Sequence, residues 1–250
     1  MSLEWDIFCT STTGGGLIAG CFGQGGETSY LQWLLSAWGW TATVAVLGFG
    51  IALLLGVPVG TLRAWPSRPW LTAIAAGWVE GFRNIPLLVQ VFLWYHVVPV
   101  FVPALKAVPS WLLVSVALGL FTSARIAEQV RAGIQSLPRG QHQAALALGM
   151  SNVQAYRLVI LPVALRFMLP ALTSEAMNIV KNSSVAFAVS IAELTQFALQ
   201  AQEETARGIE IYLAVTLLYA VTAFAVNRAL TAVESSLRVP GVGAAARQVG

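Results

Sequence analysis

Apolar residues in this chain are grouped in five runs, each long enough to cross a lipid bilayer as a helix. A crossing helix needs about 20 mainly apolar residues to span a hydrocarbon core of roughly 30 Å. The first run is longer than one perpendicular crossing, so we expect its start to lie along the outer interface. The pattern predicts an all-α bundle of five transmembrane helices, at residues 31–62, 70–101, 109–134, 162–191 and 209–230.

Small residues recur every four positions in the first predicted span, at Gly48, Ala52, Gly56 and Gly60. On a helix this spacing places them on one face. Small residues allow neighbouring transmembrane helices to approach closely. We therefore expect this face to pack tightly against another helix of the bundle.

The composition indicates a membrane protein, and the positions of Lys and Arg predict which connections face the cytoplasm. Hydrophobic residues make up 57% of the chain and charged residues 10%, whereas soluble domains carry about 25% charged residues. Lys and Arg are concentrated in the first and third connections and in the tail, as in cytoplasmic loops. We therefore expect an extracytoplasmic segment over residues 1–30, a membrane domain over 31–234 and a cytoplasmic tail over 235–250.

Both cysteines, Cys9 and Cys21, lie in the segment expected outside the membrane. An oxidising compartment would allow them to form a disulfide. Two unpaired thiols are the simpler expectation.

The third connection, residues 135–162, has helical signals of its own. Residues 141–148 form an Ala-rich helical stretch, and Gly149 after it suits a left-handed C-terminal cap. Ser151 and Gln154 match a capping box, which starts a second helix that ends before Pro162. The sequence therefore predicts two short helices at the cytoplasmic surface.

Three interpretations of this helical pair can be compared. A DNA-reading unit normally makes several phosphate contacts, and only Arg139 and Arg157 are near. A plain connection between bundle helices is usually about 2 to 8 residues long, which is much shorter. A docking knob explains the pair better, because Ala144 and Ala145 would expose a small-residue face that fits a groove of another protein.

The stretch QAALALGMSNVQAYRLVILP resembles the E-A-A, three residues, G, nine residues, I-x-L-P signature of permease subunits of binding-protein-dependent ABC importers. Gln143 stands where Glu is usual, and Val159 stands where Ile is usual. In that family the loop is a coupling helix that inserts into a cytoplasmic ATPase, and the fold is that of type I importer permeases. The resemblance assigns ATPase coupling to Gln143, Ala144, Ala145, Gly149, Leu161 and Pro162.

Three further stretches, VEGFRNIPLLVQVFLWY, ARIAEQVRAGIQSLPRGQ and SEAMNIVKNSSVAF, resemble the polar amino acid branch of this family, most closely its glutamate/aspartate permeases. The resemblance implies a bacterial inner-membrane protein that imports an amino acid. It also implies three kinds of protein partner: a dimer of ATP-binding subunits, a second permease that is identical or similar, and an outer solute-binding protein.

Residues for catalysis within this chain are scarce. No G-x-x-x-x-G-K-[ST] loop is present, since neither Lys106 nor Lys181 follows a glycine. We therefore expect the chain not to be an enzyme, with ATP and Mg²⁺ bound by the partner subunit. The two histidines, His96 and His142, leave too little material for a metal site.

A transporter or channel that works alone is the rival interpretation. It would not need a coupling stretch. Five spans without an internal repeat also argue against the inverted-repeat design that is common among secondary transporters.

Ionisable residues deep in the predicted spans are the remaining anomaly. A charge at the bilayer centre costs about 2.5 to 3.5 kcal/mol on insertion scales, so each should be paired or face a polar cavity. Glu128 lies three residues from both Arg125 and Arg131, which allows structural ion pairs. Glu175, Asn178 and Lys181 also step by three and form a polar stripe on the fourth span.

Arg125 is the expected selector of an acidic substrate. The wider branch commonly has an aromatic residue here, whereas the glutamate/aspartate permeases resemble this chain in having Arg. A guanidinium binds a carboxylate through two parallel hydrogen bonds. Arg83 or Lys181 would then hold the α-carboxylate and Glu175 the ammonium group; alternatively, Arg125 merely pairs with Glu128. The expected substrate-binding residues are Arg83, Gln90, Arg125, Glu175, Asn178 and Lys181.

Overall fold

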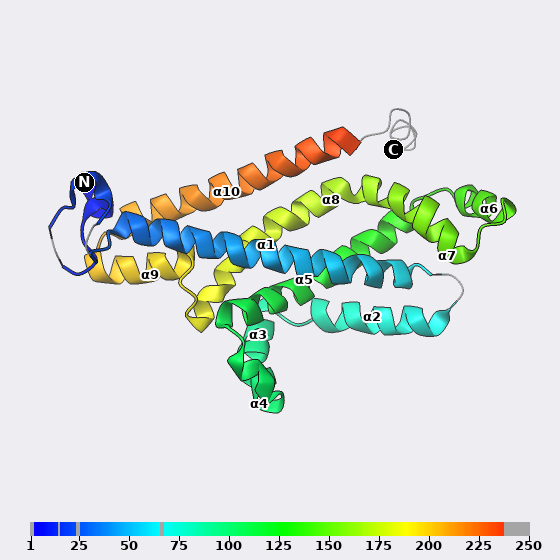
Figure 1. Ribbon diagram of the computed structural model, residues 1–250, viewed down its shortest axis with the longest axis horizontal. Helices are drawn as coiled ribbons and strands as arrows, with labels where there is room; N and C mark the ends of the chain where they lie inside the picture. The colour runs from blue at the N-terminus through cyan, green and yellow to red at the C-terminus, as the bar shows by residue number, and fades with distance from the viewer. Residues whose placement is uncertain (1–2, 15, 24–25, 66–67, 238–250) are drawn as a thin grey trace.

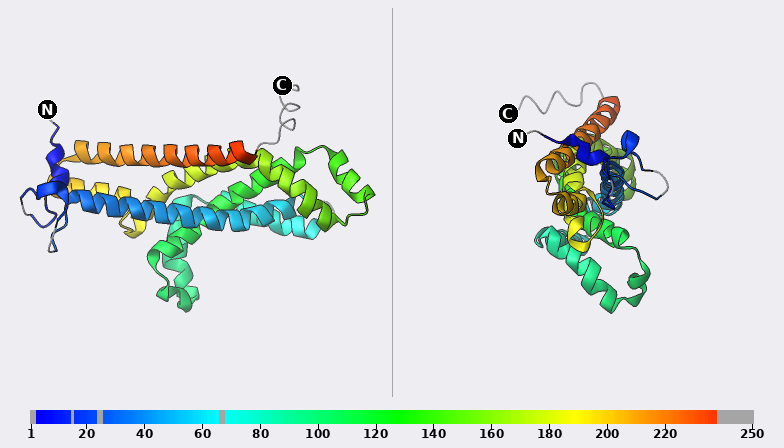
Figure 2. Two further views of the ribbon diagram at one scale, coloured as in Figure 1. Left: turned by 45° about the horizontal axis from the view of Figure 1, so that its top comes forward. Right: turned by 90° about the vertical axis from the view of Figure 1, so that its left-hand side faces the viewer.

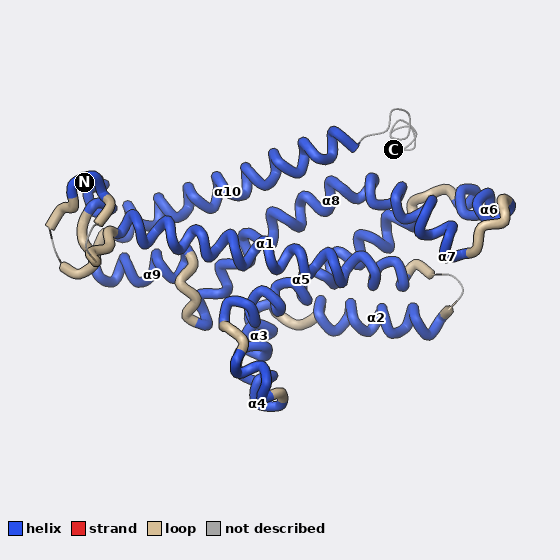
Figure 3. Tube along the Cα trace, viewed as in Figure 1, coloured by secondary structure: helices blue, strands red, loops and turns tan. Residues whose placement is uncertain are grey.

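The computed structural model describes residues 3–14, 16–23, 26–65 and 68–237, which form helices joined by short connections (Figure 1). No strand is drawn within these ranges (Figure 3). The α-helices are α1 (Tyr30–Arg63), α2 (Pro69–Arg83), α3 (Leu87–Phe92), α4 (Val98–Phe101), α5 (Ser110–Gln135), α6 (Arg139–Ala147), α7 (Asn152–Ala155), α8 (Leu161–Asn182), α9 (Leu194–Thr205) and α10 (Gly208–Leu237). Short 3-10 helices cover Trp5–Cys9, Ala19–Cys21, Pro103–Ala107 and Ser183–Val189, and π-helical turns cover Leu93–Val97 and Tyr156–Ile160.

The long helices run along one axis of the molecule, with the amino-terminal segment at one end and α6 at the other (Figure 1). Four helical stretches in the described part of the chain are long and apolar enough to cross a membrane, and a bent pair brings the number to five. The spans predicted at 109–134 and 209–230 correspond to α5 and α10. α1 is one unbroken helix of 34 residues along the long axis.

The second predicted span is broken. α2 and the helical stretch Leu87–Phe101 meet at an angle of 100°, and the α3–α4 arm leaves the bundle sideways (Figure 2). Ile85 precedes Pro86 at the break, and steric clash with a following proline disfavours helical backbone. Gln90 braces the bend, because its Nε2 donates to the carbonyl oxygens of Phe82 at 2.6 Å and Ile85 at 2.9 Å. The expectation of one continuous span over 70–101 was therefore wrong.

The small-residue face predicted on the first span is confirmed, and it packs against α5. Gly48, Ala52, Gly56 and Gly60 are all buried. A Cβ atom on Gly56 would lie 2.8 Å from the carbonyl oxygen of Ser123 on α5, closer than van der Waals contact allows. The two helices therefore approach each other almost backbone to backbone along this face.

The two short helices predicted in the third connection are present as α6 and α7. Gly149 between them has a φ of +83°, a left-handed conformation that favours glycine. Ser151 and Gln154 form the predicted capping box. The second helix does not end before Pro162, however: it continues through the π-helical turn Tyr156–Ile160 into α8. The connection is thus joined rigidly to the fourth span.

The amino-terminal segment is folded against the end of α9 and the start of α10 (Figure 1). Cys9 and Cys21 form a disulfide, so the expectation of two unpaired thiols was wrong. Glu4 forms an ion pair with Arg207, and its backbone N–H donates to Oε1 of Glu210 at 3.0 Å. These contacts tie the segment to the start of α10.

Glu193 holds α9 in place at the same end. Its carboxylate accepts hydrogen bonds from the backbone N–H groups of Thr195 at 2.9 Å and Gln196 at 3.0 Å, and from the hydroxyl of Tyr219 on α10 at 2.8 Å. Burial raises the pKa of the Glu193 carboxyl, and these donors oppose that shift. The side chain thus caps α9 and links it to α10.

The packing of α1 on α5 can be tested at Gly60. A Cβ atom there would press on the carbonyl oxygen of Ala127 and lie 2.5 Å from Cβ of Val130, so we expect Gly60→Ala to cost about 1 to 3 kcal/mol of stability. Gly50→Ala is the matched control on the same helix, because nothing lies within 4 Å of its added Cβ. Thermal unfolding in detergent measures both. Equal melting temperatures for the two variants would contradict the packing described.

Candidate functional site

A cavity of about 560 Å³ lies between the end of α2 and the second halves of α5 and α8. Five of its lining residues come from α5 at positions 121 to 132, spaced so that they share one helix face. The full lining is Arg83, Phe121, Arg125, Glu128, Gln129, Ala132 and Glu175.

Arg125 and Glu175 form the central contact of this cavity and join α5 to α8. Arg125 donates from Nε to Oε2 of Glu175 at 2.9 Å and from Nη2 to Oε1 at 3.0 Å. The Arg125 side chain is 41% exposed, whereas that of Glu175 is 5% exposed. The structure therefore pairs Arg125 with Glu175, in place of the alternative pairing with Glu128.

Gln129 completes the hydrogen bonding of Glu175. Its Nε2 donates to Oε1 of Glu175 at 3.0 Å. Glu175 thus accepts three hydrogen bonds from α5 while almost fully buried, which satisfies a charge that would otherwise be costly.

Glu128 is engaged by two other arginines. It accepts hydrogen bonds from Nε of Arg131 at 3.1 Å and Nη2 at 3.0 Å, and it forms an ion pair with Arg63 of α1. Nη1 of Arg83 is 4.0 Å from the same carboxylate, and the Arg83 side chain is 58% exposed. The structural ion pair expected between Glu128 and Arg131 is confirmed, and Arg83 is left as the most accessible cation of the cavity.

The charged residues that line the cavity balance in number, with Arg83 and Arg125 against Glu128 and Glu175. They differ in exposure: the two arginine side chains are 58% and 41% exposed, whereas the two carboxylates are 21% and 5% exposed. A ligand in this partly enclosed site therefore meets mainly positive groups, which favours an anionic ligand.

Three of the six predicted substrate residues, Arg83, Arg125 and Glu175, meet in this cavity. Gln90 does not line it, since the residue is 1% exposed and its amide holds the α2–α3 bend. Asn178 is half-buried, and Lys181 is exposed in the last turn of α8; neither lines the cavity. The predicted polar stripe therefore contributes only its first member.

Sequence reasoning missed Gln129 as a lining residue. The spacing could have identified it, because Gln129 lies four residues after Arg125 and so on the same face of α5. Its side chain is a neutral amide, however, and only ionisable residues stand out as anomalies within an apolar span.

The exposed surface of α6 is smaller than predicted. Gln143 and Ala144 are exposed, as are Leu148 and Gly149 at the end of the helix. Ala145 is only 3% exposed and packs within the chain. The expectation that both alanines face a partner was therefore wrong for Ala145.

The connection that contains α6 and α7 is anchored to the end of α1. The hydroxyl of Tyr156 donates to the carbonyl oxygen of Ala64 at 3.0 Å, and its ring lies 4.6 Å from that of Trp65. Leu161 and Pro162 begin α8 directly after this anchor. The helical pair α6–α7 is thus linked to both α1 and α8.

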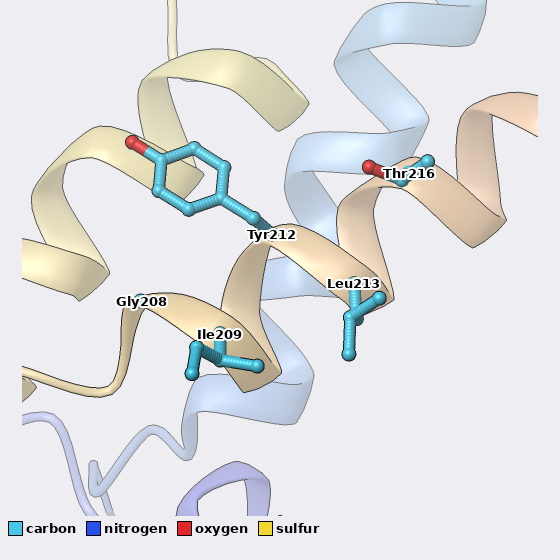
Figure 4. A pocket seen from close by; sticks show the side chains of 5 residues that line it. All are labelled: Gly208, Ile209, Tyr212, Leu213 and Thr216. Carbon is cyan, nitrogen blue, oxygen red and sulfur yellow. The ribbon is translucent and has the colours of Figure 1, made fainter.

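A second cavity, of about 510 Å³, lies at the start of α10. Figure 4 shows its mostly apolar lining of Gly208, Ile209, Tyr212, Leu213 and Thr216. The Tyr212 hydroxyl is turned toward α9, where it donates to Oε1 of Gln202 at 3.0 Å. None of the described residues that line this cavity is charged.

Comparison with known proteins places this geometry in a family. The sequence matches the family described as binding-protein-dependent transport system inner membrane component over residues 56–239. It is 41% identical over 226 residues to the glutamate/aspartate import permease protein GltJ of Escherichia coli (strain K12), covering 86% of this chain and 92% of that protein. It is 35% identical over 202 residues to the nopaline transport system permease protein NocM of Agrobacterium fabrum (strain C58), covering 78% and 83%.

A solved structure agrees with these relatives. The crystal structure of an amino acid ABC transporter with histidines superposes with a TM-score of 0.72 and 31% identity, covering 83% of this chain and 95% of that one. The likeness includes the helical architecture, so the expected type I importer permease fold is confirmed. The chain belongs to the family of inner-membrane components of binding-protein-dependent transport systems.

Proposed function

We propose that this chain is the permease subunit of an ABC importer for an acidic amino acid, glutamate or aspartate. The observation that carries the proposal is the half-exposed guanidinium of Arg125 in a cavity whose two arginines are more exposed than its two carboxylates. The 41% identity to a glutamate/aspartate import permease supports the same substrate class.

Arg125 retains donors for a substrate although Glu175 holds it. A guanidinium has five N–H donors, and the pair uses Nε and one hydrogen of Nη2. The edge formed by Nη1 and Nη2 is left for a substrate carboxylate. Arg83, as the most exposed cation of the lining, is the better candidate for the α-carboxylate, because Lys181 lies outside the cavity.

Two features indicate that the chain works with partner subunits: the exposed α6–α7 connection, and a sequence without a G-x-x-x-x-G-K-[ST] phosphate-binding loop. A dimer of ATP-binding subunits would bind ATP and Mg²⁺ and receive the exposed end of α6, and closure of the dimer would push α6. The rigid continuation of α7 into α8 supports transmission of that push to the cavity. A second permease would complete the pathway, and an outer solute-binding protein would deliver the amino acid.

The proposed orientation places the amino terminus outside and the carboxyl terminus in the cytoplasm of a bacterium. The disulfide supports it, because disulfides persist in oxidising compartments. The end of α10 lies far along the long axis from the amino-terminal segment (Figure 2). A transporter that works alone is not favoured, because the family is that of binding-protein-dependent systems.

Substrate selection is tested by uptake in cells that express Arg125→Gln and Arg125→Lys. We expect Arg125→Gln to lower glutamate uptake about tenfold or more while glutamine and histidine uptake is retained, since a hydrogen bond to a charged group is worth about 1.5 to 3 kcal/mol. Arg125→Lys should retain part of the glutamate uptake. Exposed Arg166→Gln on α8 is the matched control, and membrane levels are measured for each variant. If acidic and neutral uptake fall together, or neither falls, Arg125 is not the selector.

Coupling is tested at Ala144, whose side chain is exposed on α6. We expect Ala144→Glu to leave the protein inserted but to abolish substrate-stimulated ATP hydrolysis in the assembled transporter, because it adds charge and bulk to the docking face. Parental ATP hydrolysis by the Ala144→Glu variant would refute the docking surface.

The proposed orientation is tested with Ala144→Cys. This variant should react in intact cells with a permeant thiol reagent and not with an impermeant one. Labelling by the impermeant reagent would refute the orientation.

A further inference from the structure

We infer that Glu128 recognises the α-ammonium group of the amino acid, so that Glu128 and Arg83 together bind the zwitterionic head group. This inference rests on the proposed function. Both residues line the cavity between α2, α5 and α8. The ion pairs of Glu128 hold its side chain in position, and its place in the lining allows the same side chain to meet a ligand.

Glu128 is the more accessible of the two carboxylates in the lining, since the side chain of Glu175 is almost fully buried. Oε1 of Glu175 also accepts hydrogen bonds from Nη2 of Arg125 and Nε2 of Gln129. Oε1 of Gln129 is itself buried, so this neutral amide cannot replace a carboxylate as the acceptor. Among the described lining residues, Glu128 is therefore the anion that a ligand can reach.

The hydrogen bonds of Glu128 leave part of its carboxylate free. Oε2 accepts from both Nε and Nη2 of Arg131, and Oε1 forms the ion pair with Arg63. A carboxylate oxygen has about two lone-pair sites, so Oε1 retains an acceptor position. Neither Arg63 nor Arg131 lines the cavity, so both orient the carboxylate from outside the lining.

Arg83 and Glu128 are close enough to bind one head group and too far apart to satisfy each other. Nη1 of Arg83 lies 4.0 Å from Oε1 of Glu128, which is beyond hydrogen-bond range. An α-amino acid carries its ammonium and carboxylate groups on one carbon atom, so both groups can bind at once to a neighbouring anion and cation. The ammonium group donates to Oε1 of Glu128 while Arg83 binds the α-carboxylate.

Arg125 is placed for the side-chain carboxylate of the same ligand. It precedes Glu128 by three residues and so lies on the same face of α5. Its pair with Glu175 leaves the edge formed by Nη1 and Nη2 for a ligand. The cavity thus offers two exposed cations and one accessible anion, which match the two carboxylates and the one ammonium group of glutamate or aspartate.

The inference is tested by direct binding of radiolabelled glutamate and of radiolabelled glutarate to the purified, assembled transporter in nanodiscs without its solute-binding protein. Glutarate has both carboxylates and lacks the ammonium group. We expect Glu128→Gln to weaken glutamate binding about tenfold or more, because a charged acceptor is lost. Glutarate binding should be unchanged or tighter, because the variant removes an anion from a site that receives a dianion.

Glu80→Gln is the matched control. It makes the same chemical change one turn before Arg83, at an exposed side chain that does not line the cavity. We expect it to change the ratio of glutamate affinity to glutarate affinity by less than about twofold. Thermal unfolding shows that each variant is folded.

The outcomes separate this inference from the proposed function. If the parent does not bind glutamate, the proposed substrate and this inference both fall. If the parent binds glutamate and Glu128→Gln binds it with parental affinity, this inference alone is overturned. A folded variant that binds neither ligand, or binds both with equal weakening, would also overturn it, since Glu128 would then act only by holding the helices together.

Glu128→Asp decides the test if Glu128→Gln does not fold. It keeps a negative charge for Arg63 and Arg131 but shortens the side chain, which withdraws the carboxylate from the ligand. We expect the ratio of glutamate affinity to glutarate affinity to fall in this variant. A ratio equal to that of the parent would overturn the inference.

Discussion

Arg125 and Glu175 meet between two apolar helices, where the Glu175 carboxylate is almost fully buried. An ion in such a place is tolerated when it is paired and fully hydrogen-bonded. Glu175 receives three hydrogen bonds from α5, so the pair fixes the register of α5 against α8. The same contact leaves Arg125 partly open to the cavity. One interaction thus sets the helix packing and the chemistry of the site.

The close packing of α1 extends this constraint to the rest of the bundle. Gly56 and Gly60 allow α1 to lie directly on α5, and Arg63 at the end of α1 reaches Glu128 beside the cavity. α5 is therefore held on one side by backbone contact and on the other by charge. An element in this position can relay movement of the inner connection to the cavity, because packed helices shift as units.

Much of this architecture could be predicted from the sequence, and the exceptions have physical causes. Hydropathy located α5 and α10 because each is one long apolar segment. It could not show the bend at Pro86, since a broken helix and a straight one have the same apolar composition, although Ile85-Pro86 carried the steric signal. Spacing placed Glu175 on a polar stripe, but the partner of Glu175 lies 50 residues away on α5. Local periodicity cannot specify which helices face each other, and for the same reason it could not show that Ala145 turns inward.

The central claim is that the Arg125–Glu175 pair serves substrate recognition beyond its part in holding the helices together. The most direct measurement is glutamate binding by the double variant Arg125→Met, Glu175→Met, with its melting temperature measured alongside. Replacing both members of the pair by apolar residues leaves no unpaired charge, whereas removing Arg125 alone would leave the buried carboxylate of Glu175 without its partner. We therefore expect the double variant to melt near or above the parent and to bind no glutamate. A folded double variant that binds glutamate with parental affinity would contradict the claim.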